Sequence, residues 1–172
     1  MTDIRFAYAT LDDVPRVAAL VETAYRGEAA ATGWTNEAAF LTGPRSSPQE
    51  VERLVRAAES RFVLALDDDI LAGSALIKRH HDGAYFGMFA IDPARQQQGL
   101  GKAMMAQCET AVRELWAARY LRLGVISLRH ELIAWYERRG FVVTGEREPF
   151  PFDEAPGALR TDFDLVVLQK PL

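Results

Sequence analysis

Cysteine is almost absent from this chain: Cys108 is the single cysteine among 172 residues. One thiol can form neither an internal disulfide framework nor a multi-cysteine zinc site, and Cys108 on an apolar helix face is expected to be buried. Long hydrophobic runs are also missing, since the stretches 62–66 and 70–77 are far shorter than the roughly 18 residues that span a membrane. The first residues lack the basic and apolar regions of a secretory signal. We therefore expect a soluble, cytoplasmic protein with no membrane partner.

The chain also lacks an excess of basic residues, because 20 lysines and arginines stand against 24 aspartates and glutamates. The formal net charge of −4 gives no reason to expect a nucleic acid as partner, which requires a basic stripe or patch. Only 3 histidines are present, without organised spacing, so no metal site is expected. Hydrophobic residues at 49% and charged residues at 26% are typical of a globular chain. The length predicts a single domain over residues 1–172.

Apolar residues recur in this sequence with two different periods. The strand period predicts strands at 4–8, 61–66, 70–78, 84–91, 120–126, 141–144 and 162–168. The helical period, with Thr10 and Ser47 as caps, predicts helices at 11–25, from 48, at 100–115 and at 132–138. Short turns between the three strands from 61 to 91 favour an antiparallel meander. The order β-α-α-β-β-β-α-β-α-β-β predicts an α/β fold with a mixed sheet.

The most informative stretch is 91–102, where a strand runs into a loop and then into the start of a helix. Gly99 and Gly101 at that entry let backbone N–H groups approach a ligand, and the helix N-terminus favours an anion. Arg95 and Lys102 add positive charge, so a phosphate or pyrophosphate is the expected ligand. The alternative is an ordinary turn in which the glycines only ease helix packing.

Two common phosphate-binding loops do not fit this stretch. A Walker A loop requires glycine where Gln96 stands and a serine or threonine where Ala103 stands. The dinucleotide-binding fingerprint requires a third glycine at the position of Met104.

A different family matches better. Gln96, Gly99 and Gly101 fit the pattern Gln/Arg-x-x-Gly-x-Gly/Ala, and on this ground the chain resembles the GNAT superfamily of acyl-CoA-dependent N-acyltransferases. The segments 86–93 and 134–141 are similar to two further parts of the family pattern. The resemblance covers nearly the whole chain and implies a mostly antiparallel sheet flanked by helices, with strands splayed at the acyl-CoA site. It also implies acetyl-CoA as the donor, no metal, and a fold that allows a homodimer.

The resemblance assigns the donor to one strand end and to the loop that follows it. The strand backbone would pair with the pantetheine arm as an added strand, and the loop amides would hold the pyrophosphate. The cofactor-binding residues implied in this way are Phe89, Ala90, Ile91, Arg95, Gln96, Gln97, Gln98, Gly99, Leu100, Gly101 and Lys102. Arg129 stands where the second motif of the family often begins with asparagine, and its side chain could reach a phosphate.

Tyr136 is the catalytic candidate. An amine that attacks a thioester expels a thiolate, and a thiol of pKa about 8.5 leaves more easily when a proton is supplied. A phenol held near the sulfur can supply that proton as a general acid. Direct transfer in a ternary complex is expected, because no activated cysteine or Ser/His pair is evident. The alternative is a packing tyrosine on a short amphipathic helix.

The general base stays open. Many members of the family carry a glutamate on the fourth strand, but no carboxylate lies between Ala84 and Ile91. His80 and His81 end a strand and titrate in the useful range, and bulk water is the alternative.

Acceptor recognition is expected in the irregular segment after the first helix and in the proline-rich loop before the last strand. Tyr25, Arg26, Glu28 and Trp34 are the candidate substrate contacts. Glu28 could attract an ammonium and Arg26 a carboxylate, which favours a primary amine of an amino-acid-like or polyamine-like small molecule. The alternatives are an acetyltransferase for a protein lysine or N-terminus, favoured by an open groove, and a non-catalytic acyl-CoA-binding regulatory domain.

Overall fold

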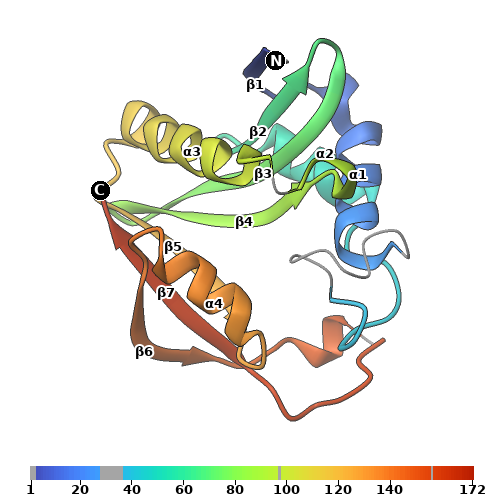
Figure 1. Ribbon diagram of the computed structural model, residues 1–172, viewed down its shortest axis with the longest axis vertical. Coiled ribbons are helices and arrows are strands. Elements are labelled where there is room, and N and C mark those ends of the chain that lie inside the picture. The colour runs from blue at the N-terminus through green and yellow to red at the C-terminus, as the bar shows by residue number, and fades with distance from the viewer. Residues whose placement is uncertain (1–2, 28–36, 97, 156) are drawn as a thin grey trace.

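The computed structural model describes residues 3–27, 37–96, 98–155 and 157–172 (Figure 1). Its strands are β1 Ile4–Tyr8, β2 Ser60–Asp67, β3 Ile70–His80, β4 Gly83–Ile91, β5 Tyr120–Ile126, β6 Val142–Glu148 and β7 Leu165–Pro171. Its main helices are α1 Val14–Arg26, α2 Pro48–Arg56, α3 Leu100–Trp116 and α4 His130–Glu137. This order of elements confirms the order predicted from the sequence. Within the described ranges, no helix is both long and apolar enough to cross a membrane.

The strands form one seven-stranded sheet in the order β1-β2-β3-β4-β5-β7-β6. Every neighbouring pair is antiparallel except β4 and β5, which run parallel. The predicted antiparallel meander is present, and it extends from β1 through β4 because β1 also pairs with β2. The mixed, mostly antiparallel sheet expected for the fold class is confirmed.

The sheet is split between β4 and β5. In the described part of the chain these strands pair only at Ala84↔Leu121 and Tyr85↔Arg122, and beyond this point they separate (Figure 1). The register between β3 and β4 shifts between Ser74 and Leu76, and Met88 has a φ of 44°. An extra residue in β4 at this position bends the strand, as bulges do. The bend directs the end of β4 away from β5 and leaves an opening in the sheet.

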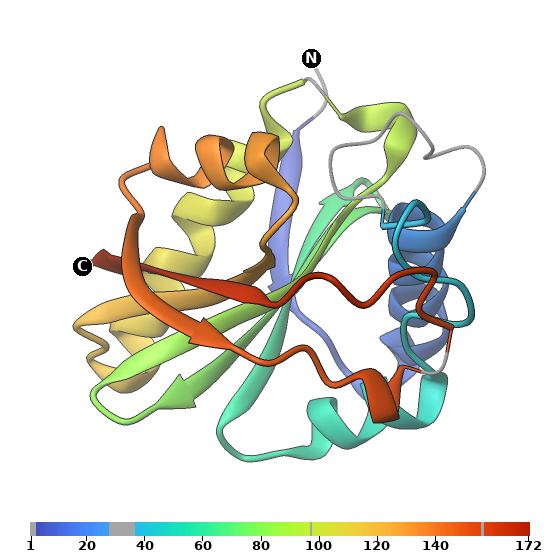
Figure 2. The same ribbon diagram turned by 90° about the horizontal axis from the view of Figure 1, so that it is seen from below.

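Helices cover the two faces of the sheet in pairs (Figure 2). Helices α3 and α4 pack on one face, where Phe86, Phe89 and Ile91 of β4 belong to their apolar cluster. Helices α1 and α2 pack on the other face, with Met88 and Ala90 of the same strand. From Met88 to Ile91 alternate residues of β4 serve two separate cores, as in a regular strand, and the extra residue at the bulge puts Phe86 on the same face as Phe89.

Two predicted local features are present where the helices form. The Ser47 hydroxyl caps α2 by accepting a hydrogen bond from the Glu50 amide at 3.1 Å. The Cys108 side chain is fully buried in the cluster under α3, and burial raises the pKa of its thiol. The role of Cys108 as a structural thiol agrees with its place in the core.

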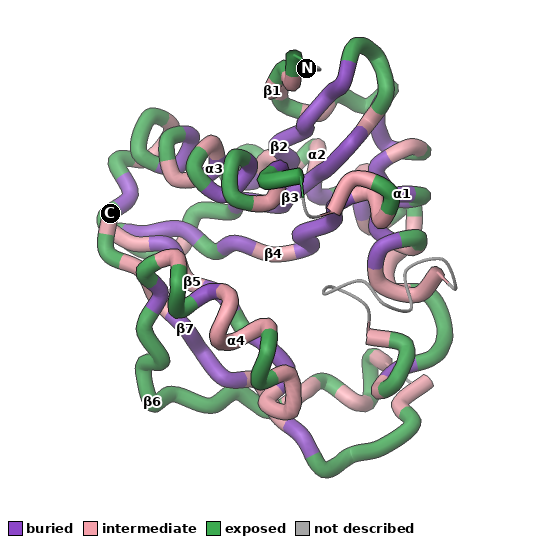
Figure 3. Tube along the Cα trace, viewed as in Figure 1, coloured by how far each residue is buried: buried purple, intermediate pink, exposed green. Residues whose placement is uncertain are grey.

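Several predicted element boundaries are wrong by a few residues, and β3 and β7 extend to His80 and Pro171 rather than to 78 and 168. Strand β6 runs to Glu148 instead of ending at Thr144, and it is exposed along its length (Figure 3). An exposed edge strand needs no alternation of apolar residues, so its polar second half gave no strand signal. Strand β7 begins at Leu165 rather than at 162, and α4 begins at His130, two residues earlier than its apolar pattern indicates.

Candidate active site

A cavity of about 510 Å³ lies at the opening between β4 and β5. Its size is in the range of sites for small ligands. Its walls come from both faces of the sheet, because α1 and the start of α2 contribute on one side and α4 on the other. The polar lining residues are Tyr25, Arg26, Glu37, Thr42, Arg45, Glu50, Tyr85, Arg129, Tyr136 and Glu154. The structure thus brings five of the predicted site residues to one cavity: Tyr25, Arg26, Phe89, Arg129 and Tyr136.

Tyr136 lies in the cavity wall on α4 and is only 6% exposed. Its ring makes edge contacts with Trp135 and Phe141, at centroid distances of 5.1 and 5.4 Å. Desolvation by burial, together with the nearby phenols of Tyr25 and Tyr85, raises the pKa of Tyr136 well above the usual value for a phenol. The hydroxyl therefore keeps its proton throughout the neutral range.

Tyr25 forms the opposite wall near the end of α1. The Arg45 guanidinium lies over its ring, 5.0 Å from the centroid, in a cation–π contact. Desolvation raises the pKa of Tyr25. Desolvation alone would lower the pKa of Arg45, but nearby Tyr25 and Glu37 raise it, so this charge is permanent.

Arg26 also lines the cavity, but its charge is already paired. Its guanidinium donates to Glu37 at 3.0 Å and to the Gly43 carbonyl oxygen at 3.2 Å. The two side chains of this ion pair are 12% and 17% exposed. Arg26 therefore holds the segment after α1 in place, in addition to forming part of the wall.

Three carboxylates that the sequence analysis did not select line the same cavity: Glu37, Glu50 and Glu154. Glu50 also accepts a hydrogen bond from the Ser46 hydroxyl at 2.7 Å, consistent with its place in the first turn of α2. None of the three lies on β4, the strand on which many members of the family resembled carry a glutamate. No local signal distinguishes them, because each reaches the cavity only through the fold. Glu28 and Trp34 lie outside the described residues.

The segment after α1 and the loop before β7 join at one side of the cavity. The Thr42 amide donates to the Gly157 carbonyl oxygen at 2.6 Å, and the Leu159 amide donates to the Phe40 carbonyl oxygen at 2.8 Å. Leu41 forms an antiparallel β-bridge with Ala158 in this junction, and its side chain is 2% exposed. These contacts close the cavity on the side of α1 and α2.

The loop before α3 has the backbone expected of an anion site. Gly99 is the N-cap of α3 with a φ of 77°, a conformation suited to glycine, and a Cβ added there would meet nothing within 4 Å. Gln98 and Lys102 are exposed, and Gly101 lies in the first turn of α3. Leu100 is 7% exposed and packs into the core, so only its backbone faces the loop. Gln97 lies outside the described residues.

Two polar residues of this loop have partners in the fold. Arg95 forms an ion pair with Asp67 at the turn between β2 and β3. The Gln96 side-chain amide donates to the Ile91 carbonyl oxygen at 3.4 Å, which ties the loop to the end of β4. These two side chains tie the loop to β2 and to the end of β4.

The remaining predicted donor contacts lie at the split edge of the sheet. Phe89, Ala90 and Ile91 are almost fully buried, and Ala90 and Ile91 pair with β3 on one side only. Phe89 lines the cavity on the β5 side of the split. Arg129 lines it from the N-cap of α4.

The histidines are not in this cavity. His80 lies at the end of β3, where the Tyr120 hydroxyl donates to its carbonyl oxygen at 3.1 Å and contacts Nδ1 at 2.9 Å. Burial, then the neighbouring His81 and Arg122, lower the pKa of His80. His81 and His130 are exposed.

Comparison with known proteins identifies the family. The acetyltransferase (GNAT) family matches residues 23–141, which is more than half of the chain. The chain belongs to this family, and it is a GNAT-type N-acetyltransferase with an acyl-CoA donor.

Solved structures show the same fold over nearly the whole chain. The ribosomal-protein-S18-alanine N-acetyltransferase from Escherichia coli is 18% identical, with a TM-score of 0.72 over 98% of this chain and 94% of that chain. A putative GNAT acetyltransferase from Desulfovibrio desulfuricans is 23% identical, with a TM-score of 0.72 over 98% and 99%. An IAA acetyltransferase from Bacillus cereus is 11% identical, with a TM-score of 0.72 over 99% and 100%. No match to the sequence was found among curated proteins.

Proposed function

We propose that this protein transfers an acetyl group from acetyl-CoA directly to a primary amine of a small molecule, in a ternary complex. The observation that carries this proposal is the cavity between β4 and β5, which is lined from both faces of the sheet and closed by the junction of residues 40–42 with 157–159. Donor and acceptor can then enter from opposite faces and meet inside the opening.

The residues at the split and at the start of α3 fit the donor. Gly99 leaves open space beside the first turn of α3, where unpaired amides and the helix dipole favour a pyrophosphate. The edge of β4 that faces the opening can pair with the amides of a pantetheine arm, as an added strand would. Residues 89–91, the loop 95–102 and Arg129 are the groups that we assign to the donor.

Acetyl-CoA supplies an activated thioester at the reacting end of this site. Tyr136 holds a proton on its phenol oxygen because its pKa is raised, and it is placed to act as the general acid for the departing sulfur. On the acceptor side, Glu50 and Glu154 are the carboxylates that would attract an ammonium group, since Glu37 is paired with Arg26. A carboxylate acting directly or through water can remove the proton that the ammonium must lose before its nitrogen attacks.

A small acceptor is favoured by the way the cavity is closed. A protein lysine or N-terminus needs an open groove in which an extended chain can lie. Here, hydrogen bonds join the backbones of 40–42 and 157–159, and Leu41, Thr42 and Gly157 of these segments form part of the cavity wall. The similar structures include a ribosomal-protein-S18-alanine N-acetyltransferase and an IAA acetyltransferase, so the fold serves both classes of acceptor.

The test is a screen of acceptors with the purified protein and acetyl-CoA. Release of free thiol is followed for a panel of small primary amines and for peptides with free N-termini and lysines, and products are checked by mass spectrometry. We expect saturable thiol release with small amines and a kcat/KM at least about tenfold lower with peptides, a difference of about 1.4 kcal/mol. Faster turnover of peptides would overturn the small-molecule assignment. Tight acetyl-CoA binding with no turnover of any amine would instead indicate a non-catalytic binding domain.

A further inference from the structure

A second cavity, of about 410 Å³, adjoins the first on the side of α2 and β3. The two cavities share Arg45, Glu50, Tyr85 and Met88 in their walls. One molecule that enters the first cavity can therefore extend into the second.

The second cavity is rich in positive charge. Five of its lining residues are arginine or lysine and two are glutamate: Arg45, Arg53, Lys78, Arg79 and Arg122 against Glu50 and Glu148. The chain as a whole has a net charge of −4, so the basic lining is a local property of this cavity. Cavities lined by one sign of charge concentrate ligands of the opposite sign.

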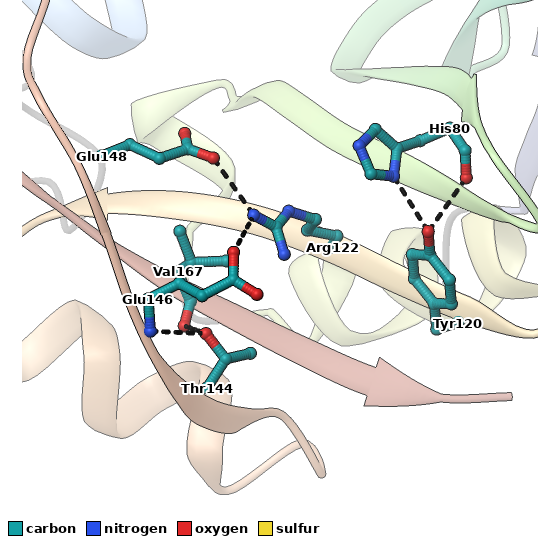
Figure 4. Close-up of polar contacts among 7 residues, drawn as sticks. All are labelled: His80, Tyr120, Arg122, Thr144, Glu146, Glu148 and Val167. Atoms are coloured by element: carbon teal, nitrogen blue, oxygen red, sulfur yellow. Dashed lines mark hydrogen bonds and ion pairs between the residues drawn. The ribbon is translucent and has the colours of Figure 1, made fainter.

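Two of these cations have partners in the fold. The Arg122 guanidinium lies between Glu146 and Glu148, at 2.6 and 3.1 Å (Figure 4). Arg79 pairs with Glu59 at 2.9 Å on the surface. His80, which also lines this cavity, is neutral near pH 7, because its pKa is lowered.

The other three cations lack such partners. Within the described part of the chain, Arg45, Arg53 and Lys78 form no ion pair within 4.0 Å. Arg45 stands between the two cavities, over the Tyr25 ring. Arg53 and Lys78 can therefore make charge-assisted hydrogen bonds with an anion, and Arg45, which also lies near Glu37 and Glu50, adds its charge beside them.

We propose that the second cavity binds an anionic group, a carboxylate or a phosphate, carried by the same acceptor whose amine reaches Tyr136. This inference rests on the proposed function and narrows its acceptor to amines that also bear an anion. The amine would lie near Glu50 and Glu154, and the anion near Arg45, Arg53 and Lys78. A polyamine is disfavoured, because its further ammonium groups would meet the basic wall. Arg26, the carboxylate partner expected from the sequence, is occupied by Glu37.

The experiment compares amines that differ only in the group at their far end. Ethanolamine, β-alanine and O-phosphoethanolamine form one series, and the six-carbon amino alcohol, amino acid and amino phosphate form a second, longer one. Binding is measured by calorimetry with CoA saturating, so that the phosphate-binding loop before α3 is already filled. Thiol release from acetyl-CoA is measured separately for the same compounds.

In at least one series, we expect the amino acid or the amino phosphate to bind about tenfold or more tightly than the amino alcohol of the same length. The tighter of the two shows whether the cavity prefers a carboxylate or a phosphate. The double variant Arg53→Gln/Lys78→Gln should lose this preference. The control Arg5→Gln/Arg56→Gln removes the same charge from exposed positions outside the cavity and should retain it.

Two results would overturn the inference. One is equal binding of the charged amines and their alcohols in both series. The other is an equal loss in the cavity and control variants, which would show a general effect of net charge. The proposed function is judged by thiol release alone. Turnover of amines without preference for an anion would refute only the binding of an anionic group in the second cavity. Anion-dependent binding without turnover of any amine would refute only the transferase assignment.

Discussion

The two sides of the opening between β4 and β5 are built differently. On the side of α3 and α4, the candidate donor site is one continuous loop, 95–102, that leads from the end of β4 into α3, and its shape depends on local backbone such as the φ of 77° at Gly99. On the side of α1 and α2, the acceptor wall joins segments more than a hundred residues apart, as the Thr42 to Gly157 hydrogen bond shows. Donor and acceptor binding should therefore respond to different substitutions.

Tyr136 lies where the two sides meet, so its loss should disable the reaction and spare both binding events. Tyr136→Phe keeps the ring packed against Trp135 and Phe141 but removes the proton. We expect kcat to fall by about 10²–10⁴-fold, the usual cost of losing a general acid. Affinity for acetyl-CoA and the melting temperature should be close to those of the unchanged protein. Tyr8→Phe, on β1 and outside the cavity, is the control. A kcat within about twofold, with chemistry limiting the rate, would make Tyr136 a packing residue.

The donor side is tested at Gly99. Gly99→Glu places a negative charge beside the first turn of α3, and we expect acetyl-CoA affinity to fall at least about tenfold, or 1.4 kcal/mol. Any residue other than glycine is strained at this φ, by about 1–2 kcal/mol. Gly99→Ala carries the same strain without the charge, so it should lower the melting temperature equally but affect affinity much less. Equal affinities of the two variants, measured by calorimetry, would mean that the donor phosphates lie elsewhere.

The acceptor side is tested at Gly157. A Cβ at this position would lie 2.0 Å from the Thr42 carbonyl oxygen, so Gly157→Ala must force the two segments apart. We expect the KM for the amine to rise by several-fold, on the order of 1 kcal/mol of lost binding, with acetyl-CoA affinity unchanged. A parallel loss of donor affinity would show that the two sides are coupled and not separately built.

His80 lies outside the opening between β4 and β5, at the wall of the second cavity, and its effect on stability is measured without substrate. Because folding lowers its pKa, the unfolded chain takes up a proton near pH 6.5 while the folded protein does not. The stability that neutral His80 contributes is therefore present above about pH 6.5 and is lost as the pH falls from there toward the folded pKa. His80→Gln should reduce the drop in melting temperature between about pH 7.5 and pH 5.5. His130→Gln, at an exposed position, should leave the drop as it is. An unchanged drop in His80→Gln would remove His80 as its source.

Much of the fold could be predicted from the sequence, because apolar periodicity and helix caps are local patterns. Apolar periodicity gives every strand and helix in order, and the Ser47 cap marks the start of α2. Exposed β6 was predicted too short, since an edge strand with no buried face has no periodic pattern to detect. The glycine at the start of α3 was predicted from the same short stretch, since Gly99 is the N-cap with a positive φ, and the binding of the donor by this loop stays a prediction.

The residues of the acceptor wall could not be predicted from the sequence in the same way. Glu37, Glu50 and Glu154 line one cavity, yet in the sequence they stand in an irregular segment, a helix cap and a proline-rich loop. Arg26 is a plausible ligand for a carboxylate until Glu37 is seen beside it. Contacts of this kind depend on how distant elements pack, and no spacing rule connects them.

The sequence by itself determined the order of the elements, the glycine loop before α3 and the place of Tyr136 on a short helix. Each follows from residues within one or two helical turns of one another. The tertiary structure decided that β4 parts from β5 after Tyr85, that residues 40–42 meet 157–159, and that Arg45, Arg53 and Lys78 share a cavity. These features arise from a bulge and from long-range packing, whose free energy depends on the whole fold and not on any one segment.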